Sequence, residues 1–200
     1  MPALPLRPDV TLYLIRHGET DWNRDARYQG QTNIGLNAHG RAQALRNGLS
    51  LATLLPDIAT ADFISSPLDR AIDTMDIIRG AMGLGTKDYR VDGALIELHY
   101  GHWEGHLASE LSSSDRDGVA AKSKDPFGWR PRGGESYADL TNRVRRWLAT
   151  LQRDTVAVTH GGVSRVARGA ILQLDTALVP TLDAPQDRIL ILRNGRMDWL

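Results

Sequence analysis

The 200-residue chain contains no cysteine, which excludes a disulfide framework, thiolate catalysis and cysteine-ligated metal centres. It has no excess of charge either, because 24 basic residues balance 24 acidic ones, so we expect no nucleic-acid or polybasic membrane-surface function. No apolar stretch approaches the roughly 20 residues that a membrane-spanning helix needs, and the first residues lack a signal-peptide pattern. We therefore expect a cytoplasmic protein without nucleic-acid or membrane partners.

The residues that are present fit an ordinary globular protein, with 42% hydrophobic and 24% charged side chains. This length predicts a single domain over residues 1–200. The stretch from about residue 109 to 134 is polar and rich in Ser, Asp, Gly and Pro, which indicates an insert or lid within that domain.

Short apolar stretches alternate with helical patterns along the chain. Asn37 and Ser66 are the expected N-caps of two helices, and apolar residues recur at helical spacing at 38, 42, 45, 49 and 52. The expected strands are 10–16, 63–65, 89–96, 155–159 and 189–192, and the expected helices are 38–55, 68–82, 137–151 and 161–174. Residues 197–200 would pair beside the last strand, and that exposed edge can support a homodimer. The alternation predicts an α/β three-layer sandwich, with a mainly parallel sheet flanked by helices.

Three chemically capable segments follow predicted strands: His17, residues 66–70, and His160. In open parallel sheets, ligands bind just beyond the carboxyl ends of the strands. The sequence therefore predicts one ligand site where these segments meet.

His17 leaves a buried strand beside Arg16 and before Gly18, which lets the backbone and a ligand approach closely. A neutral imidazole is a competent nucleophile toward phosphorus when its other nitrogen is held by a hydrogen bond. The Arg16 guanidinium suits phosphoryl oxygens. The alternative for His17 alone is a structural, hydrogen-bonded strand-end histidine.

His160 and Gly161 open a helix whose free N–H groups suit an anion, although a tight glycine turn explains the same residues. Arg70 lies in the first turn of another helix, where a cation is unfavourable with respect to the helix dipole. Arg70 is therefore either solvated or placed to meet an anion, and we favour the anion.

Together these segments resemble the histidine phosphatase superfamily, which has the phosphoglycerate-mutase-like fold. The resemblance covers nearly the whole chain in the expected order and is closer to small members such as α-ribazole phosphatases. Its motifs are LIRHGET (14–20), SSPLDRAIDT (65–74), ELHYGHWEG (97–105), GGES (133–136) and VTHGGVSR (158–165).

The resemblance implies that His17 is the nucleophile and becomes phosphohistidine, without a metal or other cofactor. Arg16, Arg70 and His160 would complete the phosphate pocket. Glu97 would protonate the leaving oxygen and then activate water. The substrate would be a small phosphate ester, bound with help from Thr20, Asn23, Gln29, Gly30, Tyr100 and Gly161.

Three histidines at 99, 102 and 106 have metal-like spacing, but no carboxylate or cysteine completes a ligand set, so we predict no metal site. His102 can instead contact substrate or tune Glu97. Trp22 and Trp103 would wall the pocket or pack beneath it, and residues 129–132 would close over substrate or form a solvated loop.

Three activities fit this pattern. Hydrolysis is favoured, because the 109–134 region is short and Arg130 and Arg132 are separated by Pro131. The phosphoglycerate mutases of the superfamily look longer, with a larger insert that carries an adjacent arginine pair. Phosphoglycerate mutase-type transfer is the first alternative. A non-catalytic phospho-ligand-binding module is the second, although every matched catalytic position holds the expected residue type.

Overall fold

The computed structural model describes residues 5–54 and 56–200 and is built around one six-stranded sheet of order β3-β2-β4-β1-β5-β6. The strands β3, β2, β4 and β1 are parallel, whereas β5 and β6 are antiparallel to their neighbours. The bounds are β1 Leu12–Arg16, β2 Asp62–Ser65, β3 Arg90–Val91, β4 Thr155–Thr159, β5 Ile189–Arg193 and β6 Arg196–Trp199.

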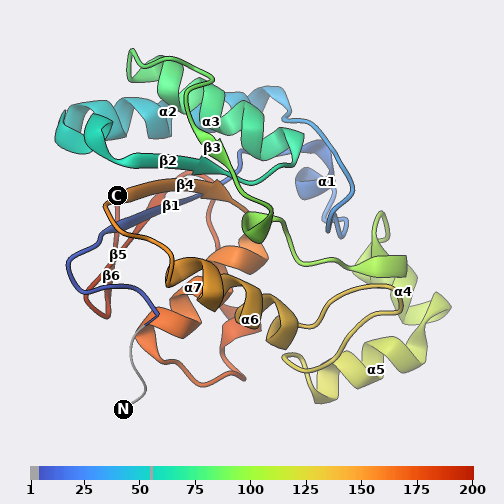
Figure 1. The fold of residues 1–200 in the computed structure, drawn as a ribbon. Coiled ribbons are helices and arrows are strands. Elements are labelled where there is room, and N and C mark those ends of the chain that lie inside the picture. Colours follow the sequence, from blue (N-terminus) through green and yellow to red (C-terminus); the bar gives the residue numbers. More distant parts are fainter. Residues whose placement is uncertain (1–4, 55) are drawn as a thin grey trace.

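Helices cover both faces of this sheet, with α2 and α3 on one side and α6 and α7 on the other (Figure 1). This arrangement confirms the expected three-layer α/β fold with a mainly parallel sheet. The helices are α1 Asp21–Arg24, α2 Ala38–Leu54, α3 Asp69–Ala81, α4 Ala108–Ser114, α5 Arg116–Lys124, α6 Tyr137–Leu148 and α7 Gly161–Leu172. Short 3-10 helices span Pro56–Thr60, Gly93–Leu95, Gly101–Trp103 and Val179–Thr181.

The continuous apolar run of β1 reflects burial on both of its faces. Leu12 and Leu14 join the core under α6 and α7, whereas Tyr13 and Ile15 join the core under α2 and α3. The helix expected over 137–151 is present as α6 but ends at Leu148, and Leu151 is buried just beyond its end. The apolar residues of α6 form one buried face: Tyr137, Leu140, Val144, Trp147 and Leu148.

The strand register aligns the carboxyl ends of three neighbouring strands. Arg16 of β1 pairs with Thr159 of β4, and Ser65 of β2 pairs with Val158 of β4. The residues that follow these strands therefore leave the same edge of the sheet side by side. The site predicted from the sequence lies at this edge.

Helix α2 is present as expected, but its apolar stripe is not its buried face. Leu45 and Leu49 are about half exposed, while Gln43 and Asn47 are buried with Leu51. Gly48 explains the orientation, because a Cβ there would lie 2.8 Å from the Ala81 Cβ and the Ile78 carbonyl oxygen. A small, partly polar face lets α2 pack closely on α3. The last residue of the predicted helix, at 55, lies outside the described residues.

Two local expectations about helix starts have different outcomes. Asn37 caps α2 as predicted, since its Oδ1 accepts a 2.8 Å hydrogen bond from the Gly40 N–H. Ser66 is not the cap of α3, because that helix begins at Asp69 with Leu68 in the cap position and no side-chain cap. The Ser66 hydroxyl is instead bonded to His160.

The predicted strand over 89–96 is much shorter than expected. Only Arg90–Val91 pairs with β2, and the chain then turns into the 3-10 helix Gly93–Leu95, where the Asp92 side chain accepts from the Ala94 N–H. Asp92 therefore stops the strand by offering the backbone a competing hydrogen bond.

The polar 109–134 region contains α4 and α5, which lie away from the sheet at the lower right of Figure 1. Trp103 is 1% exposed, its ring centroid lies 4.4 Å from that of Trp129, and its Nε1–H donates to Asp115. Trp103 thus packs between the insert and the body of the protein. Within the residues the structure describes, none of the helices is long and apolar enough to cross a membrane.

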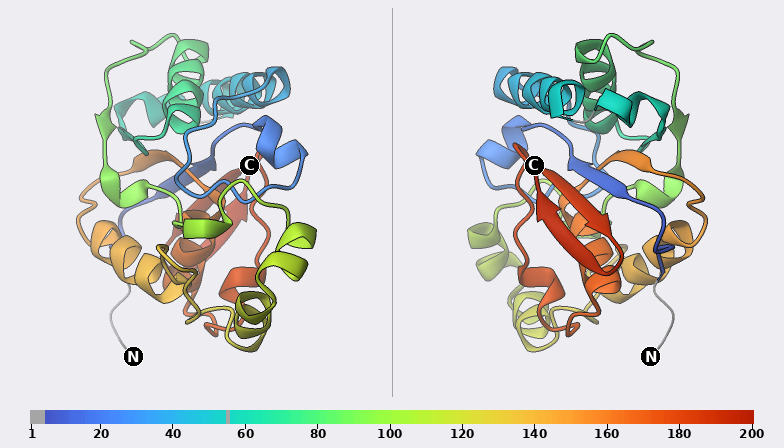
Figure 2. Two further views of the ribbon diagram at one scale, coloured as in Figure 1. Left: turned by 90° about the vertical axis from the view of Figure 1, so that its right-hand side faces the viewer. Right: turned by 90° about the vertical axis from the view of Figure 1, so that its left-hand side faces the viewer.

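The β5–β6 hairpin forms one edge of the sheet and faces the viewer in the right-hand panel of Figure 2. Met197 and Trp199 pack toward the core, whereas Arg196 is exposed. The edge strand expected near the C-terminus is therefore present. The homodimer that this edge can support stays a prediction.

Gly18 makes a close backbone contact with helix α2 rather than clearing space for a ligand alone. A Cβ at Gly18 would lie 2.2 Å from the Gly40 carbonyl oxygen. We expect Gly18→Ala to lower the free energy of unfolding by about 2–3 kcal/mol, since rigid backbone must move. Urea unfolding measures this. Gly35→Ala is the control, as its Cβ would meet nothing within 4 Å; equal midpoints for the two variants would contradict this view.

Candidate active site

His17 is held rigidly at the end of β1. Its ring is 2% exposed, and its Nδ1 lies 2.8 Å from the Gly18 carbonyl oxygen. A carbonyl only accepts, so Nδ1 carries the proton and Nε2 keeps its lone pair. The backbone is fixed as well, because the Gly18 N–H donates to the Thr74 hydroxyl and Gln186 Nε2 donates to the His17 carbonyl oxygen.

His160 lies beside His17, with the two ring centroids 5.1 Å apart. It is fully buried and immediately precedes α7, so the free N–H groups of that helix begin next to its ring. Its Nε2 forms a 2.6 Å hydrogen bond with the Ser66 hydroxyl. Its Nδ1 is buried without a protein partner. The two histidines predicted from distant motifs therefore share one site.

Arg16 and Arg70 are each anchored by backbone carbonyl groups. Arg16 donates from one terminal nitrogen to the Ala184 carbonyl oxygen at 2.7 Å. Arg70, which is 0% exposed, donates to the carbonyl oxygens of Gly30 at 2.7 Å and Thr32 at 2.8 Å. The Nε atoms of both arginines are buried without a protein partner. Because buried N–H groups are normally satisfied, these donors together with His160 Nδ1 fit an anionic ligand.

The site keeps both imidazoles neutral. Burial is the main cause that lowers the pKa of His17 well below its usual value, and the Arg70 and Arg16 charges add to the effect. Burial and the Arg70 charge lower the pKa of His160 in the same way. Burial lowers the pKa of Arg70 to about 10, which still leaves it charged at neutral pH. The site thus combines cationic guanidiniums with two unprotonated imidazole rings.

Glu97 lies against the N-terminus of α7. Its carboxylate accepts hydrogen bonds from the Gly162 N–H at 3.1 and 3.2 Å and from the Leu98 N–H at 2.8 Å. A Cβ at residue 162 would lie 2.5 Å from Glu97 Oε1, so only glycine permits this approach. Burial lowers the pKa of both Arg16 and Arg70, and the negative charge of Glu97 opposes this shift, so the carboxylate belongs to the same cluster.

Some of the residues predicted to bind substrate use their polar atoms within the protein, whereas others keep an unpartnered atom or lie beside the arginines. Thr20 and Asn23 form a reciprocal capping box at the start of α1, and Asn23 Oδ1 also accepts from Gln186, so their polar atoms are largely used within the protein.

Gln29 is buried with its Oε1 unpartnered. Gly30 supplies a carbonyl to Arg70. Gly161 lies beside Arg16, since a Cβ there would be 3.6 Å from the Arg16 Nε.

Tyr100 lines the same region from the loop after Glu97. Its ring centroid lies 4.8 Å from that of Tyr28, and burial together with Tyr137 and Glu97 raises its pKa well above the usual value. The phenol is therefore a neutral hydroxyl at physiological pH, able to donate or accept a hydrogen bond.

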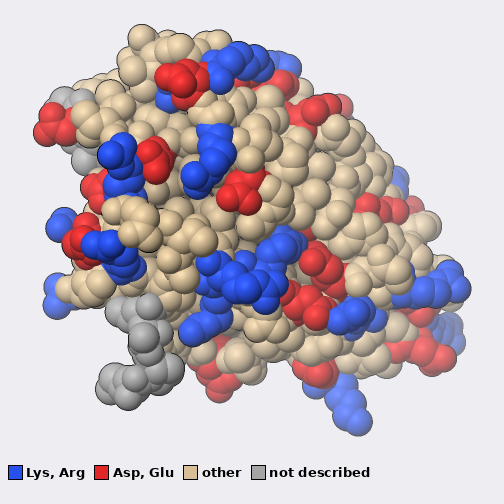
Figure 3. Space-filling model, viewed as in Figure 1, with Lys and Arg blue, Asp and Glu red and all other residues tan. Residues whose placement is uncertain are grey.

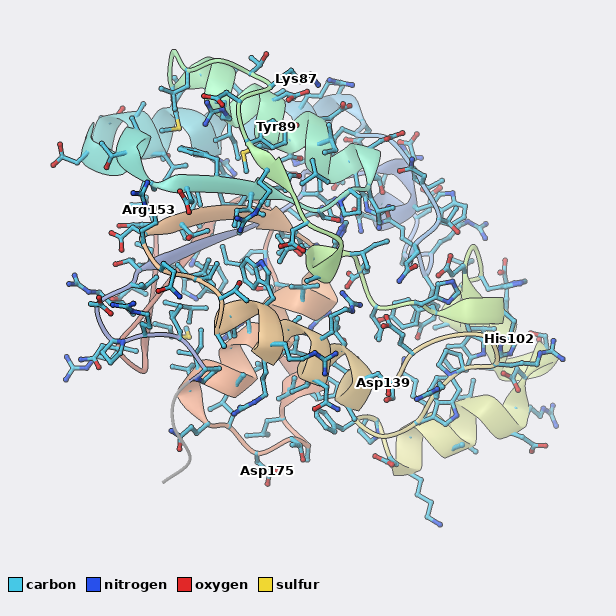
Figure 4. The ribbon with its side chains drawn as sticks, in the orientation of Figure 1. Lys87, Tyr89, His102, Asp139, Arg153 and Asp175 are labelled. Carbon is cyan, nitrogen blue, oxygen red and sulfur yellow. The ribbon has the colours of Figure 1, made fainter. Side chains whose placement is uncertain are left out.

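The histidines at 99, 102 and 106 do not converge on a point. His102 Nε2 bonds to Asp115 at 2.8 Å, and the residue lies on the insert side of the molecule (Figure 4). The expected contact of His102 with substrate or Glu97 stays a prediction. His99 Nδ1 accepts from the Gly101 N–H, and His106 lies near Glu110. Among the described residues, no group of three or more histidine or acidic side chains is placed to hold a metal ion.

Sequence reasoning missed four residues that support the site: Ser66, Thr74, Glu104 and Gln186. Ser66 and Thr74 lie inside the motif at 65–74, where Ser66 is expected only as a helix cap, and Glu104 lies inside the motif at 97–105. Gln186 lies in a loop that carries no pattern, although it holds the backbone of His17. No sequence signal marks it.

The neutral state of His17 and His160 predicts an acid-sensitive fold. In the unfolded chain each ring binds a proton near pH 6.5, but in the folded protein only at lower pH, since both pKa values are lowered. The unfolded state then holds more protons, so the free energy of unfolding falls as pH drops below about 6.5, by up to about 1.4 kcal/mol per pH unit for each ring.

Urea unfolding between about pH 7 and pH 5.5 measures this loss. Inorganic phosphate should reduce the loss, because the bound anion favours the imidazolium forms. His39→Asn serves as the control, since the His39 side chain is exposed. A stability that is constant or rises toward acid would contradict the assignment.

Comparison with known protein families shows to which family the chain belongs. The model of the histidine phosphatase superfamily (branch 1) matches residues 12–199, which include every predicted catalytic residue. The chain belongs to the histidine phosphatase superfamily. The sequence resemblance is therefore confirmed across the whole sheet, from the start of β1 to the end of β6.

Relatives within the histidine phosphatase superfamily include phosphatases and a named mutase. The chain is 33% identical over 184 residues to the glucosyl-3-phosphoglycerate phosphatase of Mycobacterium tuberculosis, covering 86% of this chain and 79% of the relative. It is 32% identical over 198 residues to the probable phosphoglycerate mutase GpmB of Salmonella paratyphi C, covering 95% and 85%.

Solved structures of the superfamily share this fold. A mycobacterial glucosyl-3-phosphoglycerate phosphatase in complex with VO3 superposes with a TM-score of 0.78 at 30% identity, covering 96% of each chain. The alpha-ribazole phosphatase from Shigella flexneri gives a TM-score of 0.79 at 26% identity, covering 91% of this chain and 89% of that one.

Proposed function

We propose that this member of the histidine phosphatase superfamily is a phosphomonoesterase that hydrolyses a small phosphate ester through a phosphohistidine on His17. The observation that carries the proposal is the meeting of two neutral, buried imidazoles with two buried guanidiniums whose Nε atoms lack protein partners. Such a site is matched to a phosphoryl group, whose transfer requires positioning and stabilisation of charge on three oxygens.

In the first step, the lone pair of His17 Nε2 attacks phosphorus and the bond to the ester oxygen breaks. Arg16, Arg70 and His160 donate to the phosphoryl oxygens, and the N-terminus of α7 adds its partial positive charge. Glu97, in its protonated form, gives its proton to the departing oxygen, because an alkoxide is a poor leaving group.

In the second step, the Glu97 carboxylate takes a proton from water as the water oxygen attacks the phosphohistidine. The phosphorus–nitrogen bond breaks, inorganic phosphate forms, and His17 returns to its neutral state with Nδ1–H still bonded to the Gly18 carbonyl. Glu97 is protonated again, so the cycle closes without any other reactant.

Similar proteins support the choice of an anionic phosphate site. One structure of the mycobacterial phosphatase holds VO3 and another holds inorganic phosphate. The face shown in Figure 3 carries both positive and negative side chains. Because the chain has 24 basic and 24 acidic residues, attraction for an anion arises locally, from the arginines of the site.

Mutase-type transfer is the alternative function. The likeness to a probable phosphoglycerate mutase keeps it open. Against it, Arg130 and Arg132 are separated by Pro131 and are not an adjacent arginine pair, and Arg130 is engaged in an exposed ion pair with Asp139 at 2.7 Å. Hydrolysis therefore remains our choice. A cytoplasmic location stays the prediction made from the sequence.

A panel of phosphate esters tests the proposal. We expect release of inorganic phosphate without added metal from one or more of glucosyl-3-phosphoglycerate, α-ribazole phosphate, 3-phosphoglycerate and an activated aryl phosphate. Isomerisation of 3-phosphoglycerate that depends on 2,3-bisphosphoglycerate would favour the mutase. Binding of phosphate with no turnover of any ester would favour a non-catalytic module.

A further inference from the structure

Glu104 is a largely buried carboxylate that no step of the proposed reaction uses. Its side chain is 13% exposed and accepts four hydrogen bonds. Oε1 accepts from the N–H groups of Gln31 at 2.9 Å and Tyr100 at 3.1 Å. Oε2 accepts from the Thr32 N–H at 3.0 Å and from the Thr32 hydroxyl at 2.6 Å. Glu104 therefore fastens the segment at 31–32 to the loop that carries Tyr100.

The fastened segment is the one that holds Arg70. The carbonyl oxygens of Gly30 and Thr32 accept from the two terminal nitrogens of Arg70, which fixes the plane of the guanidinium and leaves its Nε without a protein partner. In the same segment, Gln31 Nε2 donates to the Glu97 carbonyl oxygen at 3.0 Å. One short loop thus sets the position of a phosphate-binding cation and touches the backbone of the predicted acid.

The loop is shaped around the carboxylate. Gly30 has a positive φ of 53°, and a Cβ there would lie 1.9 Å from Glu104 Oε1. Any other residue would be strained and would displace Glu104. The glycine of this segment therefore serves the contact with Glu104, in addition to the carbonyl it offers Arg70.

We propose that Glu104 is a positioning residue for phosphoryl transfer, which acts by holding the Gly30 and Thr32 carbonyl groups that aim Arg70 at the substrate phosphate. This inference rests on the proposed function only where it is tested by kcat/KM. The negative charge of Glu104 also lies close enough to stabilise the Arg70 cation, whose pKa it raises against the effect of burial.

The first test compares Glu104→Ala and Glu104→Gln by calorimetric binding of inorganic phosphate. We expect the alanine variant to bind phosphate about a hundredfold more weakly, since small misplacements of positioned groups have effects of that order. Glutamine keeps one acceptor, facing Gln31 and Tyr100, but turns an N–H donor toward Thr32. It should therefore be intermediate, and it also serves if the alanine variant does not fold.

Asp115→Asn is the matched control. Asp115 is another carboxylate that holds several donors: Trp103 Nε1–H at 2.7 Å, His102 Nε2 at 2.8 Å and the Gly118 N–H at 3.1 Å. Its loss should lower the melting temperature without changing phosphate affinity. If phosphate binding in the Glu104 variants equals that of the wild type, or falls only as far as in Asp115→Asn, the proposal is wrong.

A double-mutant cycle with Arg70→Ala provides a readout that a purely structural role would not change. If Glu104 acts through Arg70, Glu104→Gln should lower kcat/KM about tenfold in the wild type but less than about twofold in the Arg70→Ala background. Two independent losses that multiply would overturn the proposal. Phosphate binding remains measurable even if no ester is turned over, so failure of the proposed function and failure of this inference give different results.

Discussion

Replacing His17 with asparagine is expected to lower kcat/KM by about 10⁴-fold or more, because the nucleophile is removed and the remaining donors can only bind phosphate. Asparagine is the sharper choice over alanine. Its side-chain N–H can replace the Nδ1–H bond to the Gly18 carbonyl, so the local backbone keeps its partner while Nε2 is lost. Initial rates on an activated aryl phosphate measure the effect.

The control for this variant is its affinity for inorganic phosphate. Arg16, Arg70 and His160 are untouched by the substitution, so phosphate should still bind and the melting temperature should stay close to that of the wild type. A variant that binds phosphate, remains folded and still turns over at more than about one per cent of the wild-type rate would show that another group is the nucleophile.

Glu97→Gln should show an effect that depends on the leaving group. For an alkyl phosphate we expect kcat to fall about 10²- to 10⁴-fold, the range typical of general acid–base catalysis. For an aryl phosphate with an acidic phenol, the leaving oxygen needs no proton, so formation of phosphohistidine should be nearly unaffected. Dephosphorylation would then limit turnover, since the base that activates water is missing.

Single-turnover kinetics separates these steps. The Glu97→Gln enzyme should release a burst of phenol and then turn over slowly. Glutamine can still accept the Gly162 N–H through its oxygen, so the contact with α7 is kept. Undiminished turnover of alkyl phosphates by this variant would contradict the acid role. An equal slowing of the phosphohistidine-forming step on both substrates would also contradict it, because only the alkyl leaving group needs a proton.

The layers of the fold were predictable from the sequence because their signals are local. Strand β4 is a short run in which every residue but Ala157 is β-branched, and α6 repeats its apolar residues at helical spacing. The orientation of α2 was not predictable, because its buried face is chosen by the contact of Gly48 with α3, which lies far along the chain. The short β3 depends on a single side chain, Asp92, which bonds to the backbone two residues on.

In the site, too, residues with local sequence signals were predictable, whereas residues that act through contacts far along the chain were not. His17, Arg70 and His160 lie in strongly patterned segments at strand ends, and the parallel register brings those ends together. The supporting residues were missed because they act through tertiary contacts. Gln186 reaches the backbone of His17 across 169 positions, and Glu104 reaches Thr32 across 72. The contact of His102 with Asp115 was not predictable either, because Asp115 lies in the insert, whose packing the sequence does not reveal.

The most direct test of the account is to trap the covalent intermediate. The wild-type enzyme is mixed with an aryl phosphate, quenched in alkali, which preserves phosphohistidine, and analysed by peptide mass spectrometry. We expect one added phosphoryl group on the peptide that contains His17, enriched in Glu97→Gln and absent from His17→Asn. Label on the peptide that contains His160, or turnover with no labelled histidine at any time point, would contradict it.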